Sequence, residues 1–363
     1  MTMDALKTEE LERYLRSLWG PRARVLRCVP IGKSAAPTEA KGFGYGVPIR
    51  IDADVGGRRR SVVLETMSPN AFGHEHRADR AQSILWSHSA FNELPRHVRS
   101  LDVGANRLSG EIVSLGDADE FFVLTEFVDG AGYSADLDRL RDTGVSEPVD
   151  QARADALCDY LLQIHRVRGS EPGLYVRRVR ELVGHGECIM GILDSYPTGA
   201  VSPPGLLQDI ERRAVDWRWK LKSRTHRLRQ IHGDFHPWNI LFREGTDFTV
   251  LDRSRGEWGD PADDVTCLAL NYAFFSIQRS GRVEGVLEGL FRRFWDRYLE
   301  GSGDREILEV AAPFLTFRSL VMANPIWYPR LSAIVRKRIL TFALRVLDEP
   351  KFDPARINAY LEV

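Results

Sequence analysis

The residues best suited to chemistry lie in one short run, IHGDFHPWNILF, which extends from residue 231 to residue 242. It contains a carboxylate at Asp234 and an amide oxygen at Asn239, and a second carboxylate, Asp252, follows the next apolar run. Phosphoryl transfer needs a carboxylate that orients the acceptor hydroxyl and oxygen ligands for magnesium. The pattern therefore predicts this chemistry, with Asp234 as the catalytic base or orienting group and with Asn239 and Asp252 as magnesium ligands.

Two short strands are expected to position these groups. The apolar runs 240–242 and 249–251 are separated by a segment that contains the turn residues Gly245 and Thr246. If the two runs pair as an antiparallel hairpin, Asn239 and Asp252 come close to one another. The sequence therefore predicts a hairpin directly after the catalytic loop.

With these motifs the chain resembles the aminoglycoside phosphotransferase and choline kinase family, which shares its fold with protein kinases. The resemblance rests on HGDFHPWN, on LDRS around Asp252, and on GDPADD, which extends from Gly259 to Asp264. It implies an α+β fold with two lobes, a small antiparallel-sheet N-lobe and a larger, mostly helical C-lobe. It also implies Mg2+ as cofactor, ATP or GTP as co-substrate, and a small hydroxylated acceptor.

The resemblance assigns further roles outside the catalytic loop. Asp264 would be a buried anchor for the backbone of that loop. The stretch 121–128 would be a hinge strand, in which the Glu126 carbonyl and the Val128 amide hydrogen-bond the adenine edge. Phosphate contacts would come from the glycine-rich stretch between the first two strands, because glycine amides approach phosphate oxygens closely and an ammonium adds charge. The residues of this stretch are Ser34, Lys41, Gly42 and Gly44.

One position departs from the family pattern. Kinase-like enzymes carry a lysine on the third strand that contacts the phosphates, whereas this sequence has Glu65 there. Three outcomes are open: Glu65 pairs with Arg77 or Arg80, Lys33 or Lys41 replaces the missing charge, or nucleotide binding is lost. Since the three catalytic-loop and magnesium residues remain, we expect a working enzyme. The alternative is a pseudokinase that acts as a nucleotide- or ligand-binding scaffold.

After residue 128 an apolar strand pattern gives way to turn residues and a mostly helical pattern, and we expect two lobes, 1–128 for nucleotide and 129–363 for catalysis and acceptor binding. The elements expected in the first lobe are a helix at 4–18, strands at 24–31, 45–51, 61–66, 110–115 and 121–127, and a helix at 74–87. Those expected in the second lobe are helices within 153–166, 262–299 and 306–347.

Several polar residues have a more ordinary interpretation. His165 lies on an apolar helix face and is expected to be a core histidine, Asp260 a turn cap and Asp263 a solvated carboxylate. Acidic residues near the cleft, Asp234 and also Glu257 or Asp260, would suit a cationic acceptor, and Trp258 could stack on a ring. The basic run 212–229 could bind RNA, but its pattern is more typical of a solvated helix face.

Composition excludes several classes of partner. The chain has 363 residues, which is long for one hydrophobic core and sufficient for two. Its formal net charge of −1 offers no field that would gather nucleic acid or an anionic membrane. The four cysteines have no zinc-ligand spacing, and neither an export signal nor a membrane span is evident. We therefore expect a cytoplasmic protein that binds a nucleoside triphosphate and a small molecule.

Overall fold

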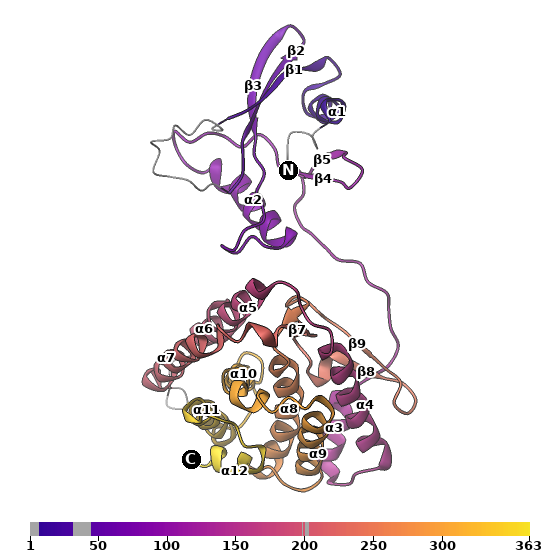
Figure 1. Cartoon of the computed structure of the whole chain (residues 1–363), viewed down its shortest axis with the longest axis vertical. Helices are drawn as coiled ribbons and strands as arrows, with labels where there is room; N and C mark the ends of the chain where they lie inside the picture. Colours follow the sequence, from indigo (N-terminus) through magenta and orange to yellow (C-terminus); the bar gives the residue numbers. More distant parts are fainter. Residues whose placement is uncertain (1–6, 32–44, 198, 200–202) are drawn as a thin grey trace. The chain divides into compact units, whose positions relative to one another are not determined.

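The computed structural model describes residues 7–31, 45–197, 199 and 203–363. The chain divides into two compact units, Met1–Thr125 and Glu126–Val363 (Figure 1). Both antiparallel sheets and helices are present, so the fold is α+β as predicted. Within the described ranges, no helix is both long and apolar enough to cross a membrane.

The N-terminal unit is built on an antiparallel sheet with the strand order β1-β2-β3. Leu11 and Leu15 of the first helix pack against Ala23, Ile51 and Ala53 of the sheet and form a small buried core. The elements of this unit are α1 (Thr8–Trp19), β1 (Ala23–Pro30), β2 (Ile49–Val55), β3 (Arg58–Leu64), α2 (Arg77–Phe91), β4 (Gly104–Asn106) and β5 (Ile112–Ser114).

A tight hairpin joins β2 to β3. Its two turn residues, Gly56 and Gly57, have φ angles of 63° and 87°, and positive φ at both positions matches the twist of the paired strands. β2 starts only after Pro48, which has no N–H to donate to a ladder. The observed strand is therefore displaced toward the turn relative to the predicted range 45–51.

The segment 117–130 contains no strand, so the predicted strand at 121–127 is wrong. Phe122, Leu124 and Phe127 are 92%, 91% and 89% exposed. A strand needs a neighbour for its backbone N–H and C=O groups. Among the described residues β4 and β5 pair only with each other, so this apolar run has no ladder to join. The division between the two units also falls within this segment.

The C-terminal unit is mostly helical, as predicted, and carries two small antiparallel sheets, β6-β8-β9 and β10-β7. Its helices are α3 (Tyr133–Thr143), α4 (Pro148–His165), α5 (Pro172–Gly184), α6 (Ile189–Asp194), α7 (Pro204–Leu221), α8 (Ala262–Ser280), α9 (Gly285–Ser302), α10 (Ile307–Ala323), α11 (Ala333–Asp348) and α12 (Ile357–Leu361). Its strands are β6 (Ala131–Gly132), β7 (Arg229–Gln230), β8 (Ile240–Phe242), β9 (Phe248–Val250) and β10 (Trp258–Gly259).

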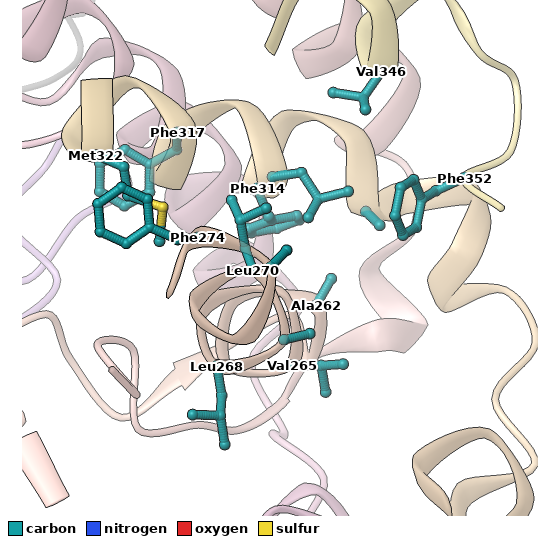
Figure 2. Close-up of a cluster of buried hydrophobic side chains, with 14 of the residues drawn as sticks. Ala262, Val265, Leu268, Leu270, Phe274, Phe314, Phe317, Met322, Val346 and Phe352 are labelled. Atoms are coloured by element: carbon teal, nitrogen blue, oxygen red, sulfur yellow. The ribbon is translucent and has the colours of Figure 1, made fainter. Parts of the chain in front are cut away.

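Helix α8 forms the centre of this unit. Every residue from 262 to 277 is buried, which is the pattern of a helix enclosed on all sides. In Figure 2, Leu270 and Phe274 of α8 face Phe314 and Met322 of α10. The first residues of α8 belong to the GDPADD segment, so the hydrophobic core fixes the position of these aspartates.

Candidate active site

The hairpin predicted after the catalytic loop is present. Strands β8 and β9 pair antiparallel, with Ile240 opposite Val250. One further hydrogen bond extends the pairing, since the Leu251 amide donates to the Asn239 carbonyl at 2.8 Å. The chain therefore brings the backbone of Asn239 beside the residue that precedes Asp252.

Asp234 is 9% exposed and is surrounded by cationic groups. Arg318 donates from Nη1 to Oδ1 at 2.5 Å, while Oδ2 lies 3.6 Å from Nε2 of His236 and 4.0 Å from Nε of Arg255. Burial by itself would raise the pKa of Asp234, but the charges of Arg318, Arg255 and His236 lower it to about 2. The carboxyl group is therefore ionised at neutral pH.

Asn239 and Asp252 have the donor atoms that a magnesium ion prefers. The side-chain amide nitrogen of Asn239 donates to the Asp234 carbonyl at 3.1 Å, which leaves its Oδ1 as the atom that can act as a ligand. Asp252 is exposed and has a φ of 55°, a left-handed conformation that few residues other than glycine adopt. Such strain is commonly retained at functional positions. An amide oxygen and a carboxylate, together with substrate phosphates, fit Mg2+.

The predicted anchor of the loop is present. The two oxygens of Asp264 accept hydrogen bonds from the backbone amides of His232 and Gly233, both at 2.7 Å. Oδ2 also lies 3.1 Å from Nε2 of His165, whose Nδ1 lies 2.8 Å from the Tyr298 hydroxyl. Burial would raise the pKa of Asp264, but the hydrogen bond and charge of His165 contribute to lowering it. His165 is thus a satisfied core histidine, as predicted.

Asp263 is not a solvated carboxylate, so that prediction is wrong. It is 2% exposed and accepts from Nη2 of Arg178 and from Nη2 of Arg318, both at 2.9 Å. Arg318 also donates to the Gly233 carbonyl at 2.9 Å, so one guanidinium joins α10, the catalytic loop and α8. No sequence signal identified Arg318, because it lies 84 positions from Asp234 and meets it only through tertiary packing.

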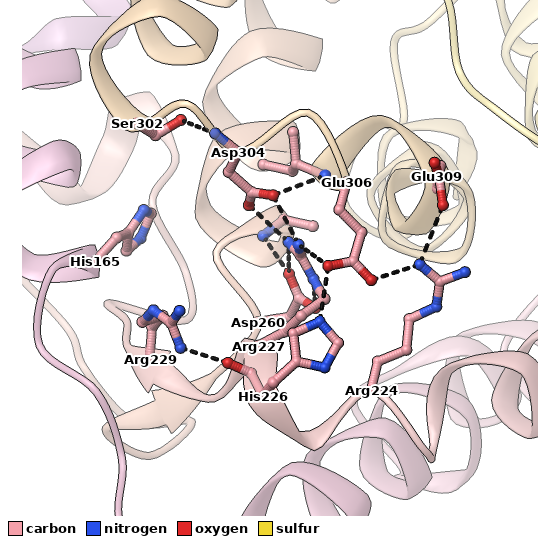
Figure 3. Close-up of polar contacts among 12 residues, drawn as sticks. His165, Arg224, His226, Arg227, Arg229, Asp260, Ser302, Asp304, Glu306 and Glu309 are labelled. Carbon is pink, nitrogen blue, oxygen red and sulfur yellow. Dashed lines mark hydrogen bonds and ion pairs between the residues drawn. The ribbon is translucent and has the colours of Figure 1, made fainter.

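Asp260 caps the start of α8, as predicted, since its Oδ1 accepts from the Ala262 amide at 2.9 Å. It also has a second function, because both of its oxygens accept from Arg227, at 2.8 and 2.9 Å (Figure 3). The Tyr175 hydroxyl donates to it at 2.9 Å. This carboxylate is 1% exposed and is paired with Arg227. The expectation that it attracts a cationic acceptor is therefore wrong. Trp258 is half-buried against the hydrophobic core and does not stand free for stacking.

The residues predicted to bind nucleotide either lie outside the described ranges or belong to a segment without helix or strand. Ser34, Lys41, Gly42 and Gly44, and also Lys33, lie outside the described residues. Glu126 is exposed and Val128 half-buried in the segment without regular structure. Their predicted roles toward adenine and phosphate stay predictions.

Glu65 is exposed and lies one residue beyond the end of β3. Of the three outcomes left open by the sequence, the first is not observed: among the described residues, Glu65 pairs with neither Arg77 nor Arg80. Arg80 instead donates to three backbone carbonyls at the start of its own helix. The charge missing from the third strand is therefore not replaced from α2.

The basic run 212–229 is mostly a two-sided helix, as predicted. Trp217 of α7 is buried and donates to the Leu347 carbonyl at 2.9 Å. Trp219 is 60% exposed, and the Lys222 ammonium lies 3.6 Å from the centre of its ring. The run thus buries one tryptophan and covers the other with a cation.

The model of the phosphotransferase enzyme family matches residues 57–300. No curated protein is found to match the chain. A solved glucosamine kinase in complex with glucosamine, ADP and inorganic phosphate is similar at 19% identity and a TM-score of 0.40, over 59% of each chain. A spectinomycin phosphotransferase in complex with ADP and spectinomycin is 12% identical with a TM-score of 0.32, over 95% of this chain and 98% of its own. The choline kinase of Streptococcus pneumoniae is 10% identical with a TM-score of 0.35, over 94% and 98%.

Proposed function

Because the chain belongs to the phosphotransferase enzyme family, we propose that it is a small-molecule kinase that transfers the γ-phosphate of ATP or GTP to a hydroxyl of a small metabolite or aminoglycoside-like antibiotic. The observation that supports this most directly is the position of Asn239. Its side chain donates to the backbone of Asp234, and its carbonyl accepts from Leu251, next to Asp252. Asn239 thus connects the backbone of Asp234 to the strand end that precedes Asp252.

Asp234 would accept a hydrogen bond from the acceptor hydroxyl and aim its oxygen at the γ-phosphate. Since Arg318 occupies Oδ1, the atom available to the acceptor is Oδ2. A carboxyl group with a pKa of about 2 is a weak base, so Asp234 acts mainly by orienting the hydroxyl. Asn239 and Asp252 would hold Mg2+, which when bound neutralises charge on the phosphates. We assign nucleotide binding to residues 1–128, the lobe for which the sequence predicts it.

The acceptor site proposed beside Asp234 is more aromatic than acidic. Trp238, 43% exposed, lies with its ring centre 5.8 Å from Phe275 and 6.1 Å from Tyr328. Asp260 and Asp263 are both neutralised by buried arginines. An aromatic side chain beside Asp234, with Asp260 and Asp263 paired to arginines, favours a hydroxylated acceptor with an apolar face, such as a sugar.

A panel of hydroxylated small molecules, assayed for ADP or GDP release with Mg2+, tests the proposal. We expect turnover with at least one acceptor and a loss of about 100-fold or more in Asp234→Ala. The matched control is Asp247→Ala, which removes an exposed aspartate from the same hairpin and should leave turnover unchanged. Undiminished turnover in Asp234→Ala would show that Asp234 is not the catalytic carboxylate.

Glu65 supports a second candidate, a scaffold that binds nucleotide or ligand without turnover. A carboxylate at the position of the phosphate-binding lysine opposes triphosphate binding, since like charges about 4 Å apart repel by about 4 kcal/mol at an effective dielectric of 20. Calorimetric titration with ATP and GTP distinguishes the candidates. Binding without ADP or GDP release across the panel supports the scaffold, whereas Mg2+-dependent binding with turnover supports the kinase.

A further inference from the structure

A polar cavity lies within the C-terminal unit, and Asp234 is not part of its lining. It has a volume of about 370 Å³ and is bounded by the end of α4, by the chain around β7 and by the loop between α9 and α10. Cavities of this size accept a small metabolite. Its polar lining includes Arg166, Arg168, His226, Arg227, Arg229, Ser302, Asp304 and Glu306.

The two carboxylates of the lining are already occupied. Asp304 accepts from both terminal nitrogens of Arg227, at 2.9 and 3.0 Å. Glu306 binds Arg224 at 2.6 Å and His226 at 2.8 Å, and Figure 3 shows these pairs together. Arg227 is in turn held by buried Asp260. These groups therefore neutralise one another and leave no free carboxylate in the cavity.

Three other guanidinium groups of the lining have no carboxylate partner among the described residues: Arg166, Arg168 and Arg229. Arg168 and Arg229 face each other across an isolated antiparallel bridge, where like charges directly opposite are destabilising. Arg229 donates only to the backbone carbonyls of His226 and Leu228. Burial lowers the pKa of Arg229, and the charges of Arg168 and Arg227 lower it further. Positive charge is therefore concentrated here, with no carboxylate among the described residues in direct contact with these three guanidinium groups.

We propose that this cavity is a binding site for a small phosphate-bearing molecule, whose dianionic group is held by Arg166, Arg168 and Arg229. Guanidinium groups bind phosphate oxygens with paired, charge-assisted hydrogen bonds. The cavity is larger than one phosphate ion requires, which favours a phosphomonoester of a small metabolite, and Ser302 offers a hydroxyl to the rest of the molecule. The lining of the cavity does not include Asp234, Asn239 or Asp252.

Calorimetric titration with inorganic phosphate, glycerol phosphate and citrate, at about 50 mM salt to limit screening, tests this proposal. The exposed arginines allow a variant that should fold, Arg166→Gln with Arg168→Gln. We expect both phosphates to bind the wild type, glycerol phosphate more tightly, and affinity to fall about tenfold or more in the double variant. The control Arg212→Gln with Arg282→Gln makes the same charge change at exposed sites elsewhere and should bind like the wild type.

Three outcomes would contradict the proposed phosphate site. Phosphate binding that survives unchanged in the double variant would place the anion elsewhere, for instance at the arginines beside Asp234, and would overturn the proposal. Citrate binding more tightly than either phosphate would overturn the ligand class. A crystal soaked in tungstate, a phosphate mimic located by its anomalous scattering, should show density between Arg168 and Arg229, and its absence there would count against the site.

Discussion

At the scale of single residues, Asp234 and Asp252 are two carboxylates in opposite environments. Asp234 is buried and ionised because Arg318 and Arg255 compensate for its lost hydration. Asp252 is exposed and held in a left-handed backbone conformation at the end of the hairpin. In the proposed mechanism, the first arrangement leaves one oxygen for the acceptor hydroxyl, and the second leaves a carboxylate in solvent for the metal.

The low pKa of Asp234 predicts a pH-dependent contribution to stability. A carboxyl group whose pKa is lower in the folded state stabilises the fold above its unfolded pKa, and this contribution is lost as the pH falls through the folded pKa. For a change from 3.8 to about 2 it amounts to about 2 kcal/mol near neutral pH. Urea unfolding of wild type and Asp234→Asn from about pH 7 to about pH 3 should show the difference between them shrinking below about pH 4. A difference that does not change over this range would contradict the low pKa.

Asp252 should control the metal dependence of nucleotide binding. We expect Asp252→Asn to weaken Mg2+-dependent ATP binding by about tenfold or more, because a charged oxygen ligand is lost. Calorimetric titration of wild type and variant, with Mg2+ and with EDTA, measures this effect, and Asp247→Asn serves as the control. Equal affinities of wild type and Asp252→Asn in Mg2+ would remove Asp252 from the metal site.

At the scale of elements, the start of α8 organises the catalytic loop. Each of three aspartates there has its own set of partners: Asp260 binds Arg227, Asp263 binds Arg178 and Arg318, and Asp264 binds the loop amides. Carboxylates at a helix N-terminus are favoured by the helix dipole, but buried ones also need specific partners. The helix therefore positions the loop through several buried ionic contacts, each of which is costly to break singly.

Arg318 provides the clearest test of this arrangement. Replacing it by methionine leaves Asp234 and Asp263 with less compensating charge, so we expect a loss of about 3–5 kcal/mol in the free energy of unfolding. Urea titration measures this loss. Arg297→Met, which breaks an exposed pair with Asp159, should change stability by no more than about 1 kcal/mol. An Arg318→Met variant as stable as wild type would show that this ionic cluster does not hold the loop.

At the scale of the whole molecule, the family match ends at residue 300, before the helix that carries Arg318. The residue in closest contact with the proposed catalytic carboxylate thus comes from outside the matched range. The two compact units are joined through an apolar segment that carries no strand. The surroundings of Asp234 therefore depend on a helix that the family match does not cover.

The junction should be the first site of proteolysis. Exposed chain without secondary structure is cleaved readily, and Phe121, Phe122 and Phe127 offer aromatic side chains to chymotrypsin. Brief digestion followed by mass spectrometry should give two fragments with new ends between residues 121 and 128. A first cut elsewhere in the chain would show that this segment is protected in solution.

Local features could be predicted from the sequence because they depend on residues close together in the chain. The hairpin after Asn239 and the helical C-terminal unit follow from motif spacing and periodicity. The anchoring contact of Asp264 was implied by the family resemblance alone. A strand at 121–127 was predicted from periodicity as well, and this was wrong because a strand also requires a partner that periodicity cannot supply.

Tertiary structure decided which charges meet. Asp263 and Asp260 look like surface residues in the sequence, yet packing around α8 buries them against arginines far away in the chain. Whether a carboxylate is solvated or paired depends on the space around it, and that space is created only when the helices pack. The sequence by itself determined the type of chemistry expected at Asp234, whereas its ionisation and its one free oxygen result from Arg318 on a distant helix.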